Sequence, residues 1–292
     1  MTICAYATFD GPDDELAPML AAWREAGIEG RAERWDDPDA DWSAYDAVVV
    51  RSVWDYVDRR EEFVGWARRV ASVTRLLNPY PVIDANTDKT YLRELGVPIV
   101  PTHWSSRELP HWPEYVVKPA VSAGARDTTR TTDRAEAARL AAALEAAGRT
   151  PMVQPYLDMV ESEGETSLLY FNRRFSHAVR RSPMLAPGAT TEDNERAELR
   201  TPAPDQVELA EKVLTAVPHD LLYARIDLVR LPGGEPALIE MELTEPYLFL
   251  TLDPAAPARF AAALRELLGQ QVMPPSTGMT APVRYAPARD DR

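Results

Sequence analysis

The feature that most constrains this chain is the segment of residues 225–250, in which two apolar-rich runs flank the sequence Leu-Pro-Gly-Gly-Glu-Pro. Gly233 and Gly234 supply the positive φ that a tight reversal needs, so the segment is predicted to form a β-hairpin. The register depends on this turn, because an odd number of loop residues would shift the pairing and send every side chain to the other face.

A turn centred between the two glycines decides which side chains share a face. Asp227 then lies opposite Glu240, and Arg225 lies opposite Glu242. Opposed side chains point the same way, as do residues two apart on one strand, so all four share one face. The other face carries the apolar residues that are expected to point toward a core: Ile226, Leu228, Ile239, Met241 and Leu243.

Three carboxylates on the polar face, those of Asp227, Glu240 and Glu242, predict a divalent-cation site. Cross-strand neighbours lie about 5 Å apart, and like charges at that distance disfavour ionisation of one another. Hard oxygen ligands suit Mg²⁺ or Mn²⁺, and Mg²⁺ commonly combines a few carboxylates with phosphate oxygens. The alternative is a solvated face, although such a face would more usually alternate the sign of its charges.

The composition argues against several classes of protein. The 46 acidic and 32 basic side chains give a formal charge of −14, which disfavours a nucleic-acid or anionic-membrane partner. The single cysteine, Cys4, cannot form an internal disulfide and fits a cytoplasmic protein, in which it is expected to be a small buried residue. No apolar run is long enough to span a membrane, and no signal-peptide pattern begins the chain.

Lysine is rare here, since the only three are Lys89, Lys118 and Lys212, and a lysine is a common ligand for nucleotide phosphates. Lys89 follows Asn86 or Thr87 as the cap of a short helix, where the helix dipole disfavours a cation unless an anion binds nearby. Lys118 ends a strand and precedes a loop of small residues whose amides could close over phosphates. A solvated position is the alternative for Lys89 and the expectation for Lys212.

The first part of the chain alternates strands with helices, which indicates a parallel α/β sheet. Strands are expected at residues 2–9, 28–35 and 46–51, and helices at 13–26 and 58–71. Ligands of such sheets lie beyond the carboxyl ends of the strands. The third strand runs directly into a polar and aromatic loop, which is the candidate for gripping a small substrate, an ordinary connection being the alternative. Its candidate residues are Arg51, Ser52, Asp55 and Tyr56.

Two later segments could contact the base and the ribose of a nucleotide. Pro155 cuts short a strand at residues 152–157, and a chain that leaves the sheet there exposes backbone groups to an adenine edge. Glu165 begins the next strand, where its carboxylate could bind ribose hydroxyls. Residues 183–204 lack periodicity and are expected to be a mobile loop or a lid, and residues 272–292 a disordered tail.

Taken in order, Lys89, VVKP with its small-residue loop, QPYL, GE, RID, and EME followed by LTEP form a pattern that resembles the ATP-grasp superfamily. The likeness is closest to the branch of glutathione synthetase and ribosomal-protein glutamate ligase, and it covers residues 80–250. It implies an α/β fold in which a parallel N-terminal domain precedes a two-lobed ATP-grasp domain. The implied division is an N-terminal domain at 1–82, a small lobe at 83–157, a large lobe at 158–271 and a tail at 272–292.

The resemblance implies ATP held between the two lobes together with Mg²⁺ or Mn²⁺. The nucleotide ligands that it implies are Lys89, Lys118, Ser122, Gly124, Gln154, Tyr156, Leu157 and Glu165. In similar enzymes the metal triad is Asp, Glu and Asn, so Glu242 adds a negative charge where an amide is usual. Arg225, where relatives often have glycine, and Arg180 are implied as the cations that stabilise the transferring phosphoryl group. Glu245 and Tyr247 are expected to touch the substrate.

The implied activity is ADP-forming carboxylate–amine ligation through an acyl phosphate. Small arginine-rich members of this kind include ligases of antibiotic biosynthesis, and the compact loop after the third strand suits a small zwitterion better than a peptide. The most specific expectation is the cyclisation of O-ureido-D-serine to D-cycloserine. An intermolecular amide ligase and a nucleotide-binding regulator without turnover are the alternatives. A small carboxylate is the expected partner, without nucleic acid or membrane, and a homodimer is left open.

Overall fold

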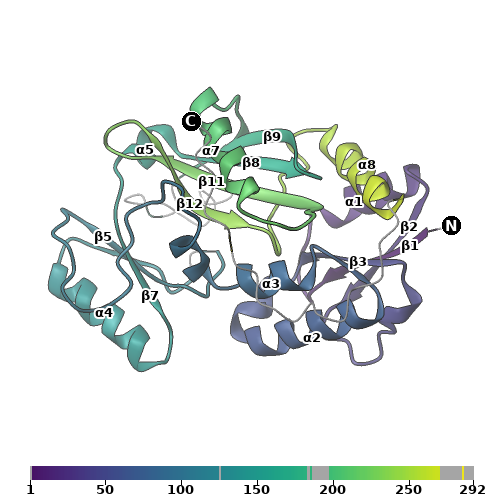
Figure 1. The fold of residues 1–292 in the computed structure, drawn as a ribbon, viewed down its shortest axis with the longest axis horizontal. Coiled ribbons are helices and arrows are strands. Elements are labelled where there is room, and N and C mark those ends of the chain that lie inside the picture. The colour runs from purple at the N-terminus through teal and green to yellow at the C-terminus, as the bar shows by residue number, and fades with distance from the viewer. Residues whose placement is uncertain (1, 125, 183–184, 186–196, 270–284, 286–292) are drawn as a thin grey trace.

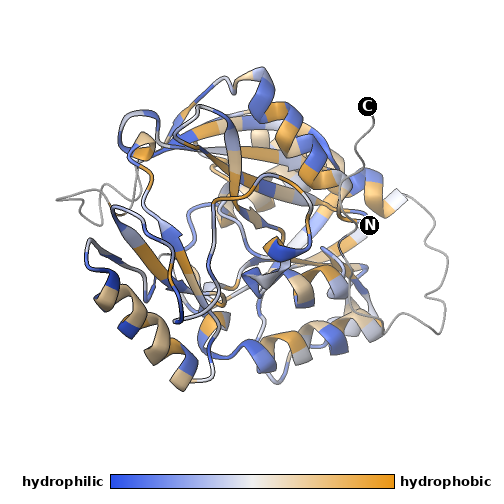
Figure 2. Cartoon of the chain, turned by 60° about the vertical axis from the view of Figure 1, so that its left-hand side comes forward, coloured by the Kyte–Doolittle hydropathy of each residue, from blue (hydrophilic) through white to orange (hydrophobic). Residues whose placement is uncertain are grey.

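A computed structural model of the chain describes residues 2–124, 126–182, 185, 197–269 and 285. Within them lie three sheets, carried by the N-terminal domain, the small lobe and the large lobe, and Figure 1 shows the large sheet lying above the other two. Figure 2 shows apolar residues gathered on the strands and on the helix faces that pack against them. No helix in the described ranges is long and apolar enough to cross a membrane.

The N-terminal domain confirms the predicted parallel sheet, whose strands run in the order β2-β1-β3-β4. Buried apolar residues fill β3, as its sequence predicts, and Cys4 is fully buried on β1. The strands are β1 (Thr2–Thr8), β2 (Ile28–Arg34), β3 (Ala47–Ser52) and β4 (Arg75–Leu77). The helices are α1 (Leu16–Glu25), α2 (Arg60–Val73) and α3 (Tyr80–Asn86), with 3-10 turns η1 (Trp42–Ala44), η2 (Trp54–Asp58) and η3 (Lys89–Arg93).

The small lobe is an antiparallel sheet in the order β6-β5-β7, covered by one alanine-rich helix. Asp133 caps that helix by accepting a hydrogen bond from the Ala135 amide. Its elements are β5 (Tyr115–Pro119), β6 (Thr129–Thr131), β7 (Pro151–Pro155) and α4 (Arg134–Ala146). Its core is a cluster of its own, whereas another apolar cluster joins the N-terminal domain to the large lobe through Tyr6, Trp23, Tyr223 and Phe260.

The large lobe is an antiparallel sheet in the order β10-β9-β8-β11-β12, so the hairpin strand β12 lies at its edge. The strands are β8 (Glu165–Phe171), β9 (Arg174–Arg181), β10 (Ala197–Leu199), β11 (Tyr223–Arg230) and β12 (Pro236–Glu242). The helices are α5 (Met159–Glu163), α7 (Pro204–Thr215) and α8 (Ala256–Gly269). In Figure 1, α8 lies beside α1 of the N-terminal domain.

The hairpin has the predicted register at the site but not at its turn. Arg225 pairs with Glu242 and Asp227 with Glu240, whereas Arg230 pairs with Pro236 and so leaves five residues in the loop. A bulge after Asp227 absorbs the odd residue and restores the shared face. Because of the bulge, the prediction that Ile239 points into the core behind the sheet is wrong. Its side chain lines a cavity instead.

Two predicted helix starts are wrong. A helix was expected to begin near residue 86, but α3 ends there and η3 follows, capped by Asp88, whose carboxylate accepts from the Thr90 amide. Asp58 does not cap α2, which has no side-chain cap. In both cases an Asn or Asp side chain has a long-range partner that the local sequence does not reveal.

The predicted loop at 183–204 and tail at 272–292 fall mostly outside the described residues. Within the first stretch Leu185 and β10 are described. Within the second, Tyr285 is buried, and its ring lies 5.6 Å from that of Tyr91. Tyr285 is therefore an anchored residue in a stretch expected to lack structure.

Candidate active site

A cavity of about 990 Å³ lies where the N-terminal domain, the small lobe and the large lobe meet. It brings together residues that were predicted separately as nucleotide, metal and substrate ligands. Those that line it are Lys89, Lys118, Ser122, Gly124, Gln154, Tyr156, Leu157, Glu165, Arg225, Asp227, Glu240, Glu242, Glu245 and Tyr247. The polar face of the hairpin is thus the wall of a cavity and not a solvated surface.

The three hairpin carboxylates are each paired with a cation. Arg225 donates to Asp227 at 2.9 Å and also to Glu242. Asp227 accepts a second charge-assisted bond from Arg181 at 3.0 Å, and Glu240 lies 3.0 Å from the ammonium of Lys89. Among the described residues no three acidic, histidine or cysteine side chains are already arranged as a cage for a metal ion.

The pKa values of Asp227 and Glu242, on the same face of the hairpin, are shifted in opposite directions. Burial raises the pKa of Asp227, but Arg225 and Arg181 outweigh it, so the net pKa lies below its usual range. Burial raises the pKa of Glu242 to about 8, and the nearby Glu240 and Asp227 act in the same direction against Arg225. The Glu242 carboxyl therefore has too little positive charge around it to stay ionised at neutral pH, and a bound cation would supply that charge.

Lys89 and Lys118 approach the carboxylates from the other side of the cavity. Burial alone would lower the pKa of Lys89, but Glu240 raises it above its usual value. Burial lowers the pKa of Lys118, and the like charge of Lys89 adds to this effect. Two ammonium groups in one cavity repel each other, which an anionic ligand between them would relieve.

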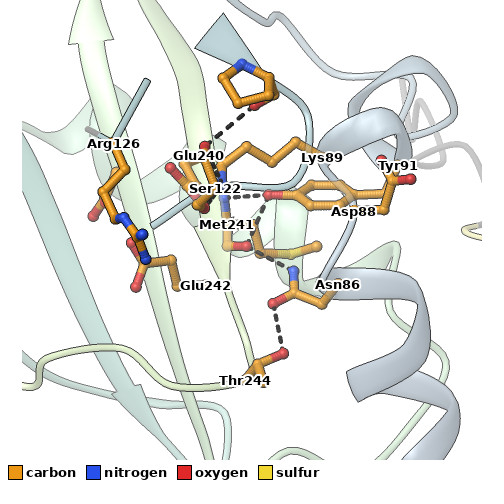
Figure 3. A network of polar contacts seen from close by, with 12 residues as sticks. Asn86, Asp88, Lys89, Tyr91, Ser122, Arg126, Glu240, Met241, Glu242 and Thr244 are labelled. Carbon is orange, nitrogen blue, oxygen red and sulfur yellow. Dashed lines mark hydrogen bonds and ion pairs between the residues drawn. The ribbon is translucent and has the colours of Figure 1, made fainter. Parts of the chain in front are cut away.

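The strand that carries Glu240 and Glu242 is fixed by Tyr91, which the sequence did not mark, and by Asn86, which was expected only as a helix cap (Figure 3). The Tyr91 hydroxyl donates to the Met241 carbonyl and accepts from the Met241 amide, both at 2.8 Å. The Asn86 amide group donates to the same carbonyl at 2.7 Å and accepts from the Leu243 amide at 2.7 Å. At this end of edge strand β12 the two side chains take the place of a neighbouring strand, whereas Leu238, further along, bonds to the backbone of Pro98 and Val100.

At the opposite end of the cavity the chain leaves β7 as predicted. Gln154 donates to Thr102 at 2.8 Å, and the Arg130 guanidinium lies 3.3 Å from the centre of the Tyr156 ring. Gly124 has a φ of +59°, so it supplies the backbone freedom expected of the small-residue loop. Arg126, in the same loop, pairs with Asp58 at 3.0 Å and connects the small lobe to the N-terminal domain.

The segment from the end of β3 into η2 does not line the cavity with the residues predicted. Arg51 is fully buried and pairs with Glu15 at 3.0 Å. Ser52 donates to Asp13, and Asp55 accepts from the Trp35 indole at 2.9 Å. Tyr56 is buried and hydrogen-bonds to the cavity carboxylate Glu245. Arg51, Ser52 and Tyr56 turn inward because acidic side chains far away in the sequence pair with them there, which the local sequence could not reveal. Asp55 is only partly buried and also pairs with Arg59.

Of two adjacent arginines on β9, the structure directs the one not predicted into the cavity. Arg180 donates to the carbonyl groups of Glu163 at 2.8 Å and Ser162 at 3.2 Å, away from the cavity lining. Arg181 lines the cavity and reaches Asp227 and Glu165. The predicted placement of Arg180 is therefore corrected to Arg181, since successive residues of a strand point to opposite faces.

Several cavity residues were missed. Phe9 and Asp14 lie beyond the carboxyl end of β1, where the rule applied to β3 would have found them. Trp54 lines the cavity from η2, and its indole donates to the Glu245 carbonyl at 2.9 Å. Phe249 lines it with a φ of +53°. Nothing in the sequence marks the conformation of Phe249.

Comparisons with known proteins agree with this architecture. Residues 1–78 match the family model described as the N-terminal domain of D-cycloserine synthetase DcsG. The cycloserine biosynthesis protein DcsG of Streptomyces lavendulae is 38% identical over 284 residues, covering 88% of this chain and 94% of the relative. The crystal structure of D-cycloserine synthetase DcsG has a TM-score of 0.84 at 35% identity, covering 91% of this chain and 99% of that one.

More distant structures share the fold. The RimK domain protein ATP-grasp from Sphaerobacter thermophilus has a TM-score of 0.63 at 14% identity and covers 91% of this chain and 99% of its own. With the strand order, the shared cavity and the DcsG match, this likeness identifies the architecture expected from the sequence. The chain belongs to the DcsG family and is an ATP-dependent, ADP-forming ligase of the ATP-grasp fold.

Proposed function

We propose that the protein uses ATP to activate the carboxylate of a small amino-acid-like substrate and closes it on a nitrogen of the same molecule, converting O-ureido-D-serine to D-cycloserine. The observation that carries the proposal is the convergence of Lys89, Lys118 and the carboxylates of the hairpin in one cavity. The resemblance to DcsG over nearly the whole chain supports the choice of substrate.

The nucleotide is assigned to the part of the cavity between the small and large lobes. Lys89, Lys118 and the loop at Ser122 and Gly124 are proposed to bind its phosphates, since ammonium groups and backbone amides are suited to anions. Gln154, Tyr156 and Leu157 are proposed to face the adenine. Glu165 is proposed to bind the ribose.

The donor chemistry of the hairpin fits a hard divalent cation. Asp227, Glu240 and Glu242 present carboxylate oxygens to the same cavity, and the raised pKa of about 8 at Glu242 is consistent with a local deficit of positive charge. When bound, Mg²⁺ or Mn²⁺ would be held by these side chains and would neutralise charge on the phosphate oxygens. The ion would then share Asp227 and Glu242 with Arg225, and Glu240 with Lys89.

The reaction begins when a substrate carboxylate oxygen attacks the γ-phosphorus of ATP and ADP leaves. Arg225 and Arg181, both beside Asp227, are proposed to stabilise the transferring phosphoryl group in place of the predicted pair of Arg225 and Arg180. A nitrogen of the same molecule then attacks the acyl carbon, and phosphate leaves. One water removes the carbamoyl group from that nitrogen, which gives D-cycloserine and carbamate, and the carbamate decomposes to carbon dioxide and ammonia.

The other end of the cavity is proposed to hold the substrate. It presents Glu245 and Asp14 as anions beside the rings of Trp54, Tyr247 and Phe249. Burial raises the pKa of Glu245 to about 7, with Lys89 opposing the shift. An anionic and aromatic wall is suited to a substrate that carries an ammonium group. We also propose that the protein works in the reducing cytoplasm, since its single cysteine, Cys4, cannot form an internal disulfide.

Phosphate release with ATP, Mg²⁺ and a panel of amino acids tests the proposal, with mass spectrometry of the products. We expect release with O-ureido-D-serine, together with ammonia and a product of the mass of D-cycloserine. A product that contains the mass of a second amine would instead identify an intermolecular ligase. ATP binding without phosphate release from any carboxylate would favour a regulator.

A further inference from the structure

The segment from Thr244 to Leu250, which follows β12, has no regular secondary structure, yet side chains satisfy its backbone. Carbonyl groups in irregular segments commonly bond to water, but here five consecutive carbonyls accept from five different side chains. They are those of Thr244 from Tyr223 at 2.8 Å, Glu245 from Trp54 at 2.9 Å, Pro246 from Arg51 at 2.8 Å, Tyr247 from Arg225 at 3.1 Å and Leu248 from His177 at 2.9 Å.

A buried ion pair of the N-terminal domain holds the amide groups of the same segment. Glu15, just before α1, accepts from the amides of Leu248 and Leu250, each at 2.9 Å. Its partner Arg51, at the end of β3, lies 3.0 Å away and donates to the Pro246 carbonyl. Glu15 is 1% exposed and Arg51 0% exposed, so neither contacts solvent or the cavity.

The residue between the two amides is Phe249, and its backbone is in the left-handed region with a φ of +53°. This conformation costs a non-glycine residue on the order of 1 kcal/mol. The Glu15 carboxylate offsets that cost by accepting from both flanking amides, as a small anion does in a backbone nest. The result is that the Phe249 ring lines the cavity, 4.9 Å from the ring of Tyr247.

The Glu15–Arg51 pair is an unusual choice for stability alone. Two buried charges lose their hydration, and an apolar pair of similar volume is often as stable or more so. Arg51 also leaves its Nε and Nη1 atoms without a hydrogen-bond partner among the described residues, with its guanidinium 5.2 Å from the Tyr223 ring. The pair is therefore better explained by the shape that it gives to residues 245–250.

We propose that Glu15 and Arg51 are positioning residues that fix the backbone of residues 245–250 and thereby determine which amino-acid substrates fit against Tyr247 and Phe249. The inference rests on the proposed function only in assigning this end of the cavity to the amino acid. It makes the N-terminal domain a determinant of specificity that acts through the large lobe's segment and not by direct contact.

Paired substitutions test the inference without leaving a charge buried alone. Glu15→Leu with Arg51→Met removes the ion pair and the acceptor of both amides, whereas Glu15→Gln with Arg51→Met keeps an acceptor oxygen. We expect the first double variant to raise KM for O-ureido-D-serine about 10-fold or more, equal to about 1.4 kcal/mol. Its KM for ATP should change less than about 2-fold, and the second double variant should recover most of the substrate affinity.

Arg75→Met is the matched control. Arg75 also belongs to the N-terminal domain and donates to a carbonyl of the large lobe, that of Leu267 on α8, but it does not line or border the cavity. We expect its KM values to stay near wild type. The inference would be overturned if Arg75→Met raised the KM for the substrate as much as the Leu/Met double variant does. It would also be overturned if the double variant raised the KM values for substrate and ATP equally, because either result would indicate that the domains pack together less firmly.

Hydrogen exchange separates this inference from the proposed function, because it needs no turnover. Amides in the peptide covering residues 244–251 should exchange faster in the Leu/Met variant than in the wild type, and peptides of the small lobe should be unchanged. Unchanged exchange in residues 244–251 would reject the positioning role. If none of the amino acids tested causes the wild-type enzyme to release phosphate, the proposed function fails. The exchange measurement would still accept or reject the positioning role of Glu15 and Arg51.

Discussion

Two polar segments of this protein have similar composition but opposite placement. The hairpin of β11 and β12 presents Arg225, Asp227, Glu240 and Glu242 directly to the cavity. The segment from the end of β3 through η2 offers a comparable set of charged and aromatic residues, but Arg51 and Ser52 are buried behind the cavity wall. The hairpin lines the proposed ligand site, whereas Arg51 supports the segment of residues 245–250 that also lines it.

The difference follows from what fixes each side chain's direction. On a paired strand, the ladder register decides the direction, so alternate residues share a face whatever their chemistry. At the end of β3 the register against β1 shifts and the chain then leaves the sheet, so Arg51 and Ser52 turn toward Glu15 and Asp13. Polar residues at the end of a strand can therefore support a binding site from behind as readily as they can contact the bound molecule.

Among substitutions that compare the hairpin with the segment after β3, the largest loss of activity is expected in the hairpin. Glu240→Gln keeps the size of the side chain but removes a proposed cation ligand and the partner of Lys89. We expect phosphate release to fall by about 10²-fold or more, the scale seen when a charge-stabilising group is lost, with little change in melting temperature. Glu235→Gln, at an exposed loop position of the same hairpin, is the control. Near-normal turnover of Glu240→Gln would contradict the metal role.

Adjacent residues of β9 provide a second comparison. Arg181→Gln removes the cation that reaches Asp227 at 3.0 Å, and we expect a loss of turnover of about 10²-fold. Arg180→Gln alters a side chain bound to the Ser162 and Glu163 carbonyls on the opposite face, so its kcat should stay within about 3-fold of wild type. The reverse order of the two effects would restore Arg180 as the cation at the phosphoryl group.

A smaller effect is expected where side chains support the hairpin from behind. Tyr91→Phe leaves the Met241 amide and carbonyl without the hydroxyl that joins them, a change that costs about 1–3 kcal/mol. We expect the Mg²⁺ concentration for half-maximal activity to rise, because β12 holds Glu240 and Glu242 less firmly. Tyr285→Phe removes a buried hydroxyl that has no hydrogen-bond partner within the described ranges, and it should be nearly neutral. Equal Mg²⁺ dependence in both variants would argue against a positioning role for Tyr91.

The smallest expected effect concerns pH and the segment after β12. His177 Nε2 donates to the Leu248 carbonyl, and burial lowers the pKa of His177. The unfolded chain then binds a proton more readily, so stability is lost as the pH falls below about 6.5, by at most about 1.4 kcal/mol per pH unit. Denaturant unfolding between pH 7.5 and 5 should show a shallower dependence for His177→Gln than for wild type. Parallel curves would exclude His177 as the source.

Much of the nucleotide end could be predicted from the chain alone because its signals are local. Lys118 lies near the end of a strand and a small-residue loop follows directly, so connectivity brings both to the same part of the cavity. The substrate end combines Phe9, Trp54 and Phe249, which are far apart in the sequence. No local pattern relates them, so only the packing of the N-terminal domain on the large lobe could do so.

The sequence by itself determined the strands and the type of ligase, because strand period and motif order survive without tertiary information. The predicted register at the carboxylates holds only because a bulge offsets the five-residue loop, which the sequence did not indicate. Only the tertiary structure decided that Arg181 and not Arg180 faces the cavity, that Arg51 is buried, and that Phe249 adopts a positive φ. The physical reason is that these outcomes depend on partners such as Glu15 and Glu163, which the chain brings close only on folding.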